Sequence, residues 1–337
     1  MEEKSICIVG GGSLGTVIAG VLSSKGIEVN LLTNHPEKWN SEIAVYHPSG
    51  DIFSGSIKTI SSNAEDVIPR ADVILLCLPG PQIKEALEKI APYLTERHFL
   101  GSVFSSTGFF FEAIKIFGDR IPLWGFQRVP FIARVKEYGK SGYLLGYKPS
   151  LNIAIENAPQ SEKEEFRRFI ESAFKCPTAL LGSYLEASLT NSNPLLHTAR
   201  LYSLFAENES EQMYPRNFLF YEEWTDLASE LLIQMDKELF KLIAKLNLTE
   251  GFLKPILEYY ESRDAESLTK KIRSIESFKG IMSPMKEIKG GWVPDKESRY
   301  FQEDFKYGLR YIWQLCHNEG IECPGIDRVY EWGNEFL

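Results

Sequence analysis

The sequence predicts an α/β protein in which an amino-terminal parallel-sheet domain precedes an all-helical carboxy-terminal domain. In the first half, short β-rich runs alternate with helical patterns, which is typical of βαβ units around a parallel sheet. Beyond residue 182 the pattern is almost only helical. A length of 337 residues suits two domains rather than one. We therefore predict one domain over residues 1–182 and another over residues 183–337.

The elements of the first domain follow from the period of their apolar residues. Four apolar runs are predicted to be buried strands: Ser5–Val9, Glu28–Leu32, Asp72–Leu78 and His98–Phe104. Helical patterns follow the first and third of them, at Leu14–Ser24 and Pro81–Tyr93. Two shorter runs, Ile43–Tyr46 and Ile52–Ser56, flank a Pro-Ser-Gly turn and are expected to pair as a hairpin.

The second domain is predicted from long amphipathic patterns. They are Tyr184–Phe205 with a break near Pro194, Phe218–Leu246, Phe252–Arg263, Tyr300–Asn318 and Gly325–Asn334. The segment Lys279–Ser298 contains two prolines and a Gly-Gly pair, so we expect a long irregular loop there. Because such loops are commonly functional, a substrate lid is the interpretation that we favour.

Composition and charge limit the partners of this chain. A formal net charge of −9 argues against nucleic acid, which requires a basic face. No apolar run approaches the roughly 18–20 residues that span a bilayer, and the amino terminus lacks the pattern of a signal peptide. The five scattered cysteines form no CxxC pair or metal-ligand motif. We expect a cytoplasmic protein without a metal, and a homodimer remains open.

A glycine fingerprint carries the most specific local signal. The run Ser5–Val9 is followed by Gly10, Gly12 and Gly15 in the spacing GxGxxG, and then by a helical pattern. The first glycine permits a tight turn, the second a close approach of pyrophosphate, and the third helix–strand packing. We therefore predict a Rossmann domain that binds a dinucleotide through Gly10, Gly12, Ser13, Leu14 and Gly15.

The end of the second strand bears on which dinucleotide is bound. NAD sites usually carry an acidic residue there, which holds the ribose 2′-hydroxyl. Here the neutral Thr33 and Asn34 stand at that point, and Lys38 is near enough to neutralise a 2′-phosphate, although Glu37 could take the acidic role. NADP is the expected cofactor and NAD the alternative. Leu78 and Pro79, after the third strand, are expected to line the same cleft.

Two segments of the second half resemble the octopine/nopaline (opine) dehydrogenase family. One runs from Thr190 to His197 and contains an N-x-x-x-H pattern, and the other contains R-Y-x-x-E-D-x-x-x-G-L from Arg299 to Leu309. The resemblance extends over nearly the whole chain, and the second segment is its most specific part. The residues ahead of Pro130 depart from the family's usual pattern, which puts the substrate in doubt.

The resemblance implies a reductive condensation with an acid–base pair. In such a reaction an α-keto acid and the amino group of an amino acid form an imine, and hydride from NAD(P)H reduces it. The family's catalytic histidine and aspartate match His197 and Asp304, and its carboxylate-binding arginine matches Arg299. These assignments are what the resemblance implies.

The residue types agree with such chemistry. Histidine changes protonation near neutral pH, a nearby carboxylate would fix its tautomer, and arginine offers a planar fork to a carboxylate. Arg134 is a candidate for a second substrate carboxylate. Asn193 is expected to cap a helix that starts at Pro194 and to contact substrate, a role for which Asn191 competes. Tyr300, with the tyrosines at 307 and 311, is interpreted as a packing stripe.

Two other functions remain open on the sequence. One is a ketopantoate-type reductase that acts with NADPH on a simple keto acid. Such enzymes place a lysine four residues before a helical asparagine, where this chain has Ala187 or Leu189, so this alternative is weaker. The other is a non-catalytic NADP-binding sensor, against which the joint presence of His197, Arg299 and Asp304 argues mildly.

Overall fold

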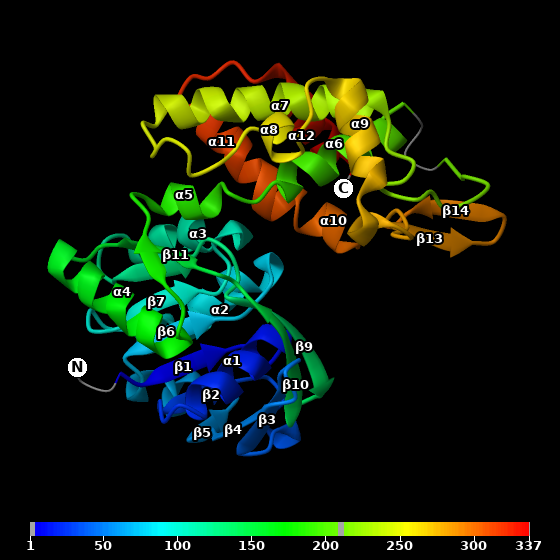
Figure 1. The fold of residues 1–337 in the computed structure, drawn as a ribbon. Coiled ribbons are helices and arrows are strands. Elements are labelled where there is room, and N and C mark those ends of the chain that lie inside the picture. The colour runs from blue at the N-terminus through cyan, green and yellow to red at the C-terminus, as the bar shows by residue number, and fades with distance from the viewer. Residues whose placement is uncertain (1–3, 208–211, 337) are drawn as a thin grey trace. The chain divides into compact units, whose positions relative to one another are not determined.

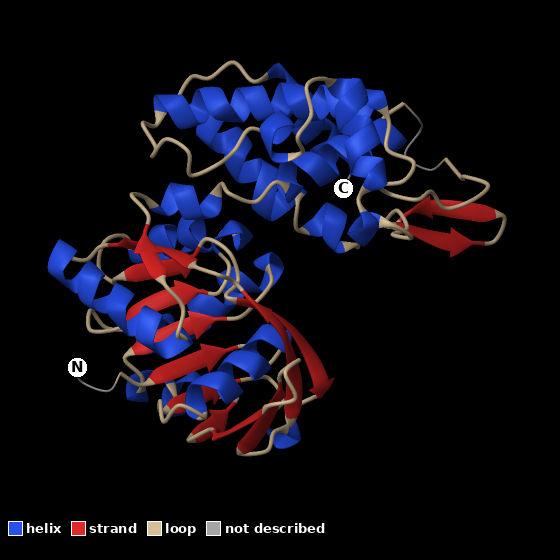
Figure 2. Cartoon of the chain, in the orientation of Figure 1, coloured by secondary structure: helices blue, strands red, loops and turns tan. Residues whose placement is uncertain are grey.

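A computed structural model describes residues 4–207 and 212–336 of the chain. The chain divides into two compact units, residues 1–188 and residues 189–337. The division follows α5 (Tyr184–Ser188), because this short helix packs against strands of the first unit. Strands make up the core of the first unit, whereas helices dominate the second (Figures 1 and 2).

The first unit is built on an eight-stranded sheet in the order β12-β11-β8-β7-β6-β1-β2-β5. All neighbouring pairs are parallel except β8 and β11. The strands are β1 (Ile6–Val9), β2 (Val29–Leu32), β5 (Thr59–Ser61), β6 (Val73–Leu76), β7 (Phe99–Ser102), β8 (Leu123–Phe126), β11 (Leu151–Glu156) and β12 (Thr178–Leu180).

Both faces of this sheet are buried. Ile6 and Ile8 of β1 belong to one apolar core, and Cys7 and Val9 belong to another, as the alternation of side chains along a strand requires. The covering helices are α1 (Ser13–Ser23), α2 (Gly80–Ile90), α3 (Phe109–Phe117) and α4 (Gln160–Phe174). The predicted parallel sheet with helices between its strands is confirmed.

A second sheet covers the outer side of α1. Its order is β4-β3-β10-β9, and its strands are β3 (Glu42–Tyr46), β4 (Ile52–Ser56), β9 (Phe131–Glu137) and β10 (Ser141–Tyr147). The pairing of β3 with β4 confirms the predicted hairpin. Gly20 of α1 permits a close approach, because a Cβ there would lie 2.6 Å from Val45 Cγ2.

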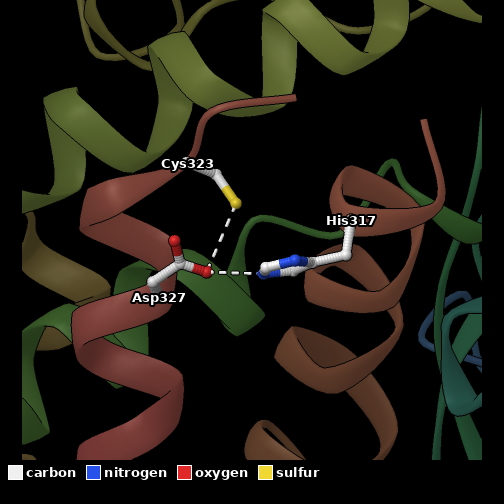
Figure 3. Close-up of side chains that lie close together, drawn as sticks. All are labelled: His317, Cys323 and Asp327. Atoms are coloured by element: carbon white, nitrogen blue, oxygen red, sulfur yellow. Dashed lines mark hydrogen bonds and ion pairs between the residues drawn. The ribbon is translucent and has the colours of Figure 1, made fainter. Parts of the chain in front are cut away.

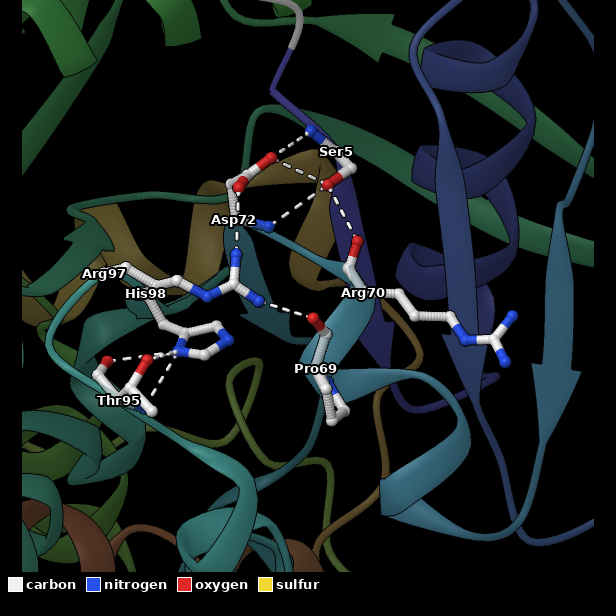
Figure 4. A network of polar contacts seen from close by, with 7 residues as sticks. All are labelled: Ser5, Pro69, Arg70, Asp72, Thr95, Arg97 and His98. Atoms are coloured by element: carbon white, nitrogen blue, oxygen red, sulfur yellow. Dashed lines mark hydrogen bonds and ion pairs between the residues drawn. The ribbon is translucent and has the colours of Figure 1, made fainter.

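A polar network ties the amino ends of β1 and β6 together (Figure 4). The carboxylate of Asp72 accepts hydrogen bonds from the Ser5 backbone N–H at 2.9 Å and from the Ser5 hydroxyl at 2.8 Å. Arg97 approaches the same carboxylate at 3.3 Å. Burial raises the pKa of Asp72, but the bonds from Ser5 and the charge of Arg97 outweigh it and lower that pKa overall. The network is structural, since sheets of this kind bind ligands at the carboxyl ends of their strands, the opposite edge.

The second unit is a bundle around α7 (Asp226–Lys245), which contacts α6, α9, α11 and α12. The other helices are α6 (Asn193–Phe205), α8 (Ile256–Tyr259), α9 (Ala265–Ser274), α10 (Arg299–Gln302), α11 (Arg310–Asn318) and α12 (Pro324–Phe336). Between α10 and α11 lies a π-helical turn, Phe305–Leu309. Within the described residues no helix has both the length and the apolar character needed to cross a bilayer.

Three elements of this unit differ from the sequence prediction. Residues 218–225 form a bridge, a turn and irregular backbone instead of helix, and the buried Arg200 side chain binds the carbonyl groups of Phe220 and Glu223. The helix predicted over Phe252–Arg263 shrinks to α8, since Pro255 precedes it and Glu261 takes a positive φ of 51°. The segment Lys279–Ser298 holds a hairpin of β13 (Met285–Ile288) and β14 (Gly291–Pro294), whose two-residue turn places Gly290 at φ 104°.

Asp236 makes the stability of the second unit depend on pH. It is 9% exposed in α7, and one of its oxygens accepts the backbone N–H of Ile256 at 3.0 Å. Burial raises the pKa of Asp236 to about 6, and the bond from Ile256 lowers it only partly. The carboxyl group ionises at a lower pH in the unfolded chain, so stability falls as pH rises from about 4 through 6.

We expect Asp236→Asn to remove this loss. At pH 7 the substitution should raise the unfolding free energy by about 1–3 kcal/mol and should leave little effect at pH 4. Urea unfolding at both pH values measures the difference, with Glu230→Gln on the exposed side of the same helix as control. An equal effect of Asp236→Asn at both pH values would contradict the claim that ionisation of Asp236 lowers the stability.

Candidate active site

A cavity of about 530 Å³ opens at the carboxyl ends of β1, β2 and β6 in the first unit. Its lining includes Gly10 and Gly12 after β1, Thr33 and Asn34 after β2, and the pair Leu78–Pro79 after β6. These strands are neighbours in the sheet, so their ends meet at one edge. The cavity therefore lies where a doubly wound sheet binds its ligands.

The three fingerprint glycines differ in what surrounds them. Gly10 has φ 108°, and a Cβ there would lie 2.9 Å from the Cys77 carbonyl oxygen. A Cβ on Gly15 would overlap the Gly10 carbonyl oxygen, so this glycine lets α1 pack on β1. A Cβ on Gly12 would meet nothing within 4 Å. The space at Gly12 thus fits a ligand rather than the fold, which agrees with the approach of a pyrophosphate.

Helix α1 starts directly after Gly12, which has no side chain with which to cap it. Backbone N–H groups of its first turn are suited to bind an anion. Ser13 and Leu14 belong to this turn but are not among the residues that line the cavity. The Ser13 hydroxyl accepts the Val135 backbone N–H at 3.2 Å, which ties the turn to β9.

Some of the polar residues after β2 line the cavity, and others do not. Thr33 is buried and Asn34 is exposed, and both line the cavity. Lys38 is exposed in a 3-10 turn and is not among the lining residues, while Glu37 faces His35 at 3.4 Å. The lysine that lines the cavity is Lys89 of α2. Sequence reasoning missed it, because only packing shows which face of α2 borders the ligand space.

In the second unit His197 and Asp304 meet across 107 residues of chain. His197 lies on α6 with its side chain 10% exposed, and its Nδ1 is 2.8 Å from Asp304 Oδ2. A carboxylate only accepts hydrogen bonds, so Nδ1 carries the proton in this contact. The sequence-predicted pair is therefore in hydrogen-bond contact, in the arrangement in which an acid orients a base.

Close packing between two helical segments brings these residues together. Asp304 stands immediately before the π-helical turn that contains Gly308. A Cβ on Gly308 would lie 2.6 Å from Pro194 Cγ, one turn before His197 on α6. Only glycine permits this approach, so Gly308 sets the separation of the helices that carry the acid and the base. π-helical turns of this kind are frequent at functional sites.

The other imidazole nitrogen binds a residue that sequence reasoning missed. His197 Nε2 lies 2.8 Å from the hydroxyl of Tyr221, which is 5% exposed. Burial raises the pKa of Tyr221 above its ordinary value, and the neighbouring Tyr300 raises it further. The Tyr300 ring lies 4.6 Å from the imidazole ring, between ring centroids. No spacing rule in the sequence links Tyr221 to His197.

A buried arginine fixes the turn that carries Tyr221. The Arg200 side chain is 1% exposed, and its Nε and Nη2 donate to the carbonyls of Phe220 at 2.9 Å and Glu223 at 2.7 Å. Its guanidinium carbon lies 5.8 Å from the Trp224 ring centroid. Burial lowers the pKa of Arg200 to about 10, so the group is charged at neutral pH. Arg200 holds the backbone on both sides of Tyr221 and thereby positions its hydroxyl.

Arg299 lies in the same segment as Asp304 and is open to solvent. Its side chain is 81% exposed and makes a bidentate pair with Glu303, at 2.7 and 2.8 Å. The hydrogen bonds from Glu303 raise the pKa of Arg299. A planar fork that already holds one carboxylate has the geometry to exchange it for another.

Asn193 is not the helix cap that the sequence analysis expected. Helix α6 begins at Asn193 itself, and Ser192, the residue before it, makes no side-chain cap bond. The Asn191 side chain instead accepts the backbone N–H of Asn193 at 3.2 Å, and the Asn193 residue is half-buried. In the first unit, Arg134 is exposed on β9 and donates to the Ala133 carbonyl at 3.0 Å.

Two known protein families match this chain, one in the first unit and the other chiefly in the second. The family described as NAD/NADP octopine/nopaline dehydrogenase, alpha-helical domain, matches residues 180–337. The family described as ketopantoate reductase PanE/ApbA matches residues 6–103. The match of the helical half therefore points to a narrower class of enzyme than the match of residues 6–103.

Relatives and solved structures match over nearly the whole chain. Octopine dehydrogenase of Pecten maximus is 24% identical over 98% of this chain and 89% of its own length. Tauropine dehydrogenase of Arabella iricolor is 25% identical over 98% of this chain and 91% of its own. An octopine dehydrogenase structure with NADH and L-arginine shares the fold with a TM-score of 0.84, at 24% identity and coverage of 98% and 89%. The resemblance found in the sequence is confirmed: residues 180–337 match the octopine/nopaline dehydrogenase helical-domain family, and relatives of that kind are similar over nearly the whole chain.

Proposed function

We propose that this chain is an NAD(P)H-dependent opine dehydrogenase-like oxidoreductase. It condenses an α-keto acid with the amino group of an amino acid, with loss of water, and reduces the resulting imine to a secondary amine. The contact between His197 and Asp304 carries this proposal, because it supplies an oriented acid–base group in the family's pattern. The dinucleotide supplies the hydride when bound, and the space at Gly12 fits its pyrophosphate.

The contacts of His197 suit a group that gains and loses a proton at Nε2. With neutral imidazole, the Tyr221 hydroxyl donates to Nε2. With Nε2 protonated, Nε2 donates and the Tyr221 hydroxyl oxygen accepts. Because a hydroxyl can donate or accept, the Tyr221 hydroxyl stays paired with Nε2 in either protonation state. Asp304 holds the ring through Nδ1 in both states.

Three side chains are proposed to bind substrate. Arg299 would exchange Glu303 for a substrate carboxylate, and Arg134 would hold a second one, since the product class carries two. Asn193, at the start of the helix that carries His197, is proposed to donate or accept a further hydrogen bond. Within the first unit, the neutral Thr33 and Asn34 beside Lys89 support NADP as the cofactor, with NAD as the alternative.

One assay tests the function. Oxidation of NADPH or NADH is followed by absorbance with a panel of α-keto acids, with amino acids added or withheld. We expect oxidation only when both substrates are present. Turnover with a keto acid alone would instead support a ketopantoate-type reductase, the second candidate, which the family match of residues 6–103 favours. Tight cofactor binding without any turnover would indicate a sensor.

The Tyr221 hydroxyl is expected to contribute to turnover through His197. Tyr221→Phe should lower kcat about tenfold with little change in KM, since one hydrogen bond is worth about 1–1.5 kcal/mol. Steady-state kinetics of the condensation measure both constants. Tyr202→Phe is the matched control, because it removes a hydroxyl from the helix that carries His197, on a ring that packs against Trp332. An unchanged kcat for Tyr221→Phe would remove this residue from the mechanism.

The compartment and the assembly are also proposals. The five cysteines are free in this structure, which supports a reducing compartment such as the cytoplasm. A homodimer remains a proposal for light scattering to test. A monomer at working concentrations would reject it and leave the catalytic proposal untouched.

A further inference from the structure

A cluster of metal-ligand residues lies in the second unit, where α11 ends and α12 begins. It consists of His317, Cys323 and Asp327, whose ligand atoms all lie within 4.8 Å of one another (Figure 3). His317 is in the last turn of α11, and Asp327 is in the first turn of α12. The spacing H-x5-C-x3-D matches no metal motif that sequence reasoning uses, which is why no metal was expected. The packing of the two helices brings the residues together.

The ligand atoms lie near one another, one pair at a separation found around a four-coordinate metal and one pair closer, at hydrogen-bond distance. Asp327 Oδ1 lies 2.8 Å from His317 Nε2 and 3.5 Å from Cys323 Sγ. Around tetrahedral zinc, with bonds of about 2.0–2.3 Å, ligand atoms lie roughly 3.3–3.7 Å apart. Small side-chain movements would therefore open the cluster enough to admit the ion.

The surroundings provide an outer shell and an entry path. Trp313 Nε1 donates to Asp327 Oδ1 at 3.0 Å, and the Trp313 ring lies 4.4 Å from that of His317. Such contacts orient metal ligands. Cys323 is 1% exposed, whereas the His317 side chain is 50% exposed. The thiol thus forms the closed side of the site, and the imidazole borders the solvent from which an ion and a water ligand would come.

We propose that His317, Cys323 and Asp327 bind one Zn²⁺ ion, with water as the fourth ligand, and that the ion joins α11 to α12. Thiolate, imidazole and carboxylate together suit zinc rather than magnesium or calcium. The Cys323 thiol loses its proton to solvent as the sulfur–zinc bond forms, and no electron is transferred. The site is structural, and the inference does not depend on the proposed function.

Substitution of Cys323 separates a zinc site from a simple hydrogen-bonded cluster. Cys323→Ser keeps a donor for Asp327 but removes the thiolate. His317→Gln is a second variant, at a half-exposed position where misfolding is not expected. His47→Gln is the matched control, since this half-buried histidine lies beside a turn of the first unit and hydrogen-bonds to Ser49.

The experiment titrates the chelator-treated full chain with Zn²⁺ in a calorimeter, and with Co²⁺ in a spectrophotometer. We expect one Zn²⁺ per chain, a thiolate-to-cobalt charge-transfer band, and a Tm that rises with zinc. Cys323→Ser should lose the band, and both site variants should weaken zinc binding more than about tenfold, while His47→Gln binds normally. Zinc binding that is absent from the natural chain, or unchanged in Cys323→Ser, would overturn the proposal.

Discussion

Replacement of His197 by alanine is expected to lower kcat by about 10³-fold, within the range that general acid–base groups supply. The substitution removes the group that contacts both Asp304 and Tyr221 at 2.8 Å. The affinity for the reduced cofactor should stay unchanged, because the residues that line the dinucleotide cavity belong to the first unit. Steady-state kinetics of the condensation and a fluorescence titration with NADPH measure the two quantities.

A double variant sharpens this prediction. Asp304 is proposed to act only through His197, so Asp304→Asn should lower kcat in the natural chain but have little further effect when His197 is already alanine. His47→Ala removes a half-buried histidine of the first unit and serves as the control for a lost imidazole. Turnover by His197→Ala near that of the natural chain would refute the catalytic role of His197. Additive effects of the two substitutions would show that Asp304 does not act through His197.

Replacement of Gly12 by alanine is expected to weaken dinucleotide binding about 100-fold, which corresponds to about 3 kcal/mol. The added Cβ meets no protein atom within 4 Å, so the folded chain accommodates it, but it would occupy the space that we assign to the pyrophosphate. The Tm should therefore remain within about 2 °C of that of the natural chain. Calorimetric titration with NADPH and thermal unfolding provide the two measurements.

Two further glycine variants serve as controls for the effect of an added Cβ on folding and on cofactor affinity. Gly15→Ala should lower the Tm, because its Cβ would overlap the Gly10 carbonyl oxygen where α1 packs on β1. Gly146→Ala adds a Cβ in open space on β10 and should change neither the Tm nor cofactor affinity. If Gly12→Ala bound NADPH as tightly as the natural chain, the cavity would have to bind the cofactor in another way.

The local elements of the first unit follow directly from the sequence. The continuous apolar run Ile6–Val9 and the glycines after it define a strand, a turn and a helix within about 20 residues. The same holds for the hairpin of β3 and β4, whose apolar runs flank a turn. Such features are encoded by neighbours in the chain, so no distant residue is needed to predict them.

The helical unit shows where local pattern is insufficient. Residues 218–225 have the apolar spacing of a helix, but they form a bridge, a turn and irregular backbone, and Arg200 binds the carbonyl of Phe220. In the first unit, Lys89 of α2 lines the cavity although its local pattern does not single it out, and the role of Lys38 stays a prediction. In both cases the residue that matters is distant in sequence from the segment in question. The periodicity of that segment carries no information about it.

The sequence by itself determined the fold class, the glycine turn and, through its family resemblance, the pairing of residues 197 and 304. Only the tertiary structure revealed Tyr221 on the second imidazole nitrogen, Arg200 behind it, and the cluster at His317. The physical reason is that hydrogen bonds between side chains depend on how helices approach one another. That approach is set by close contacts such as Gly308 on Pro194, which arise only when the chain is packed.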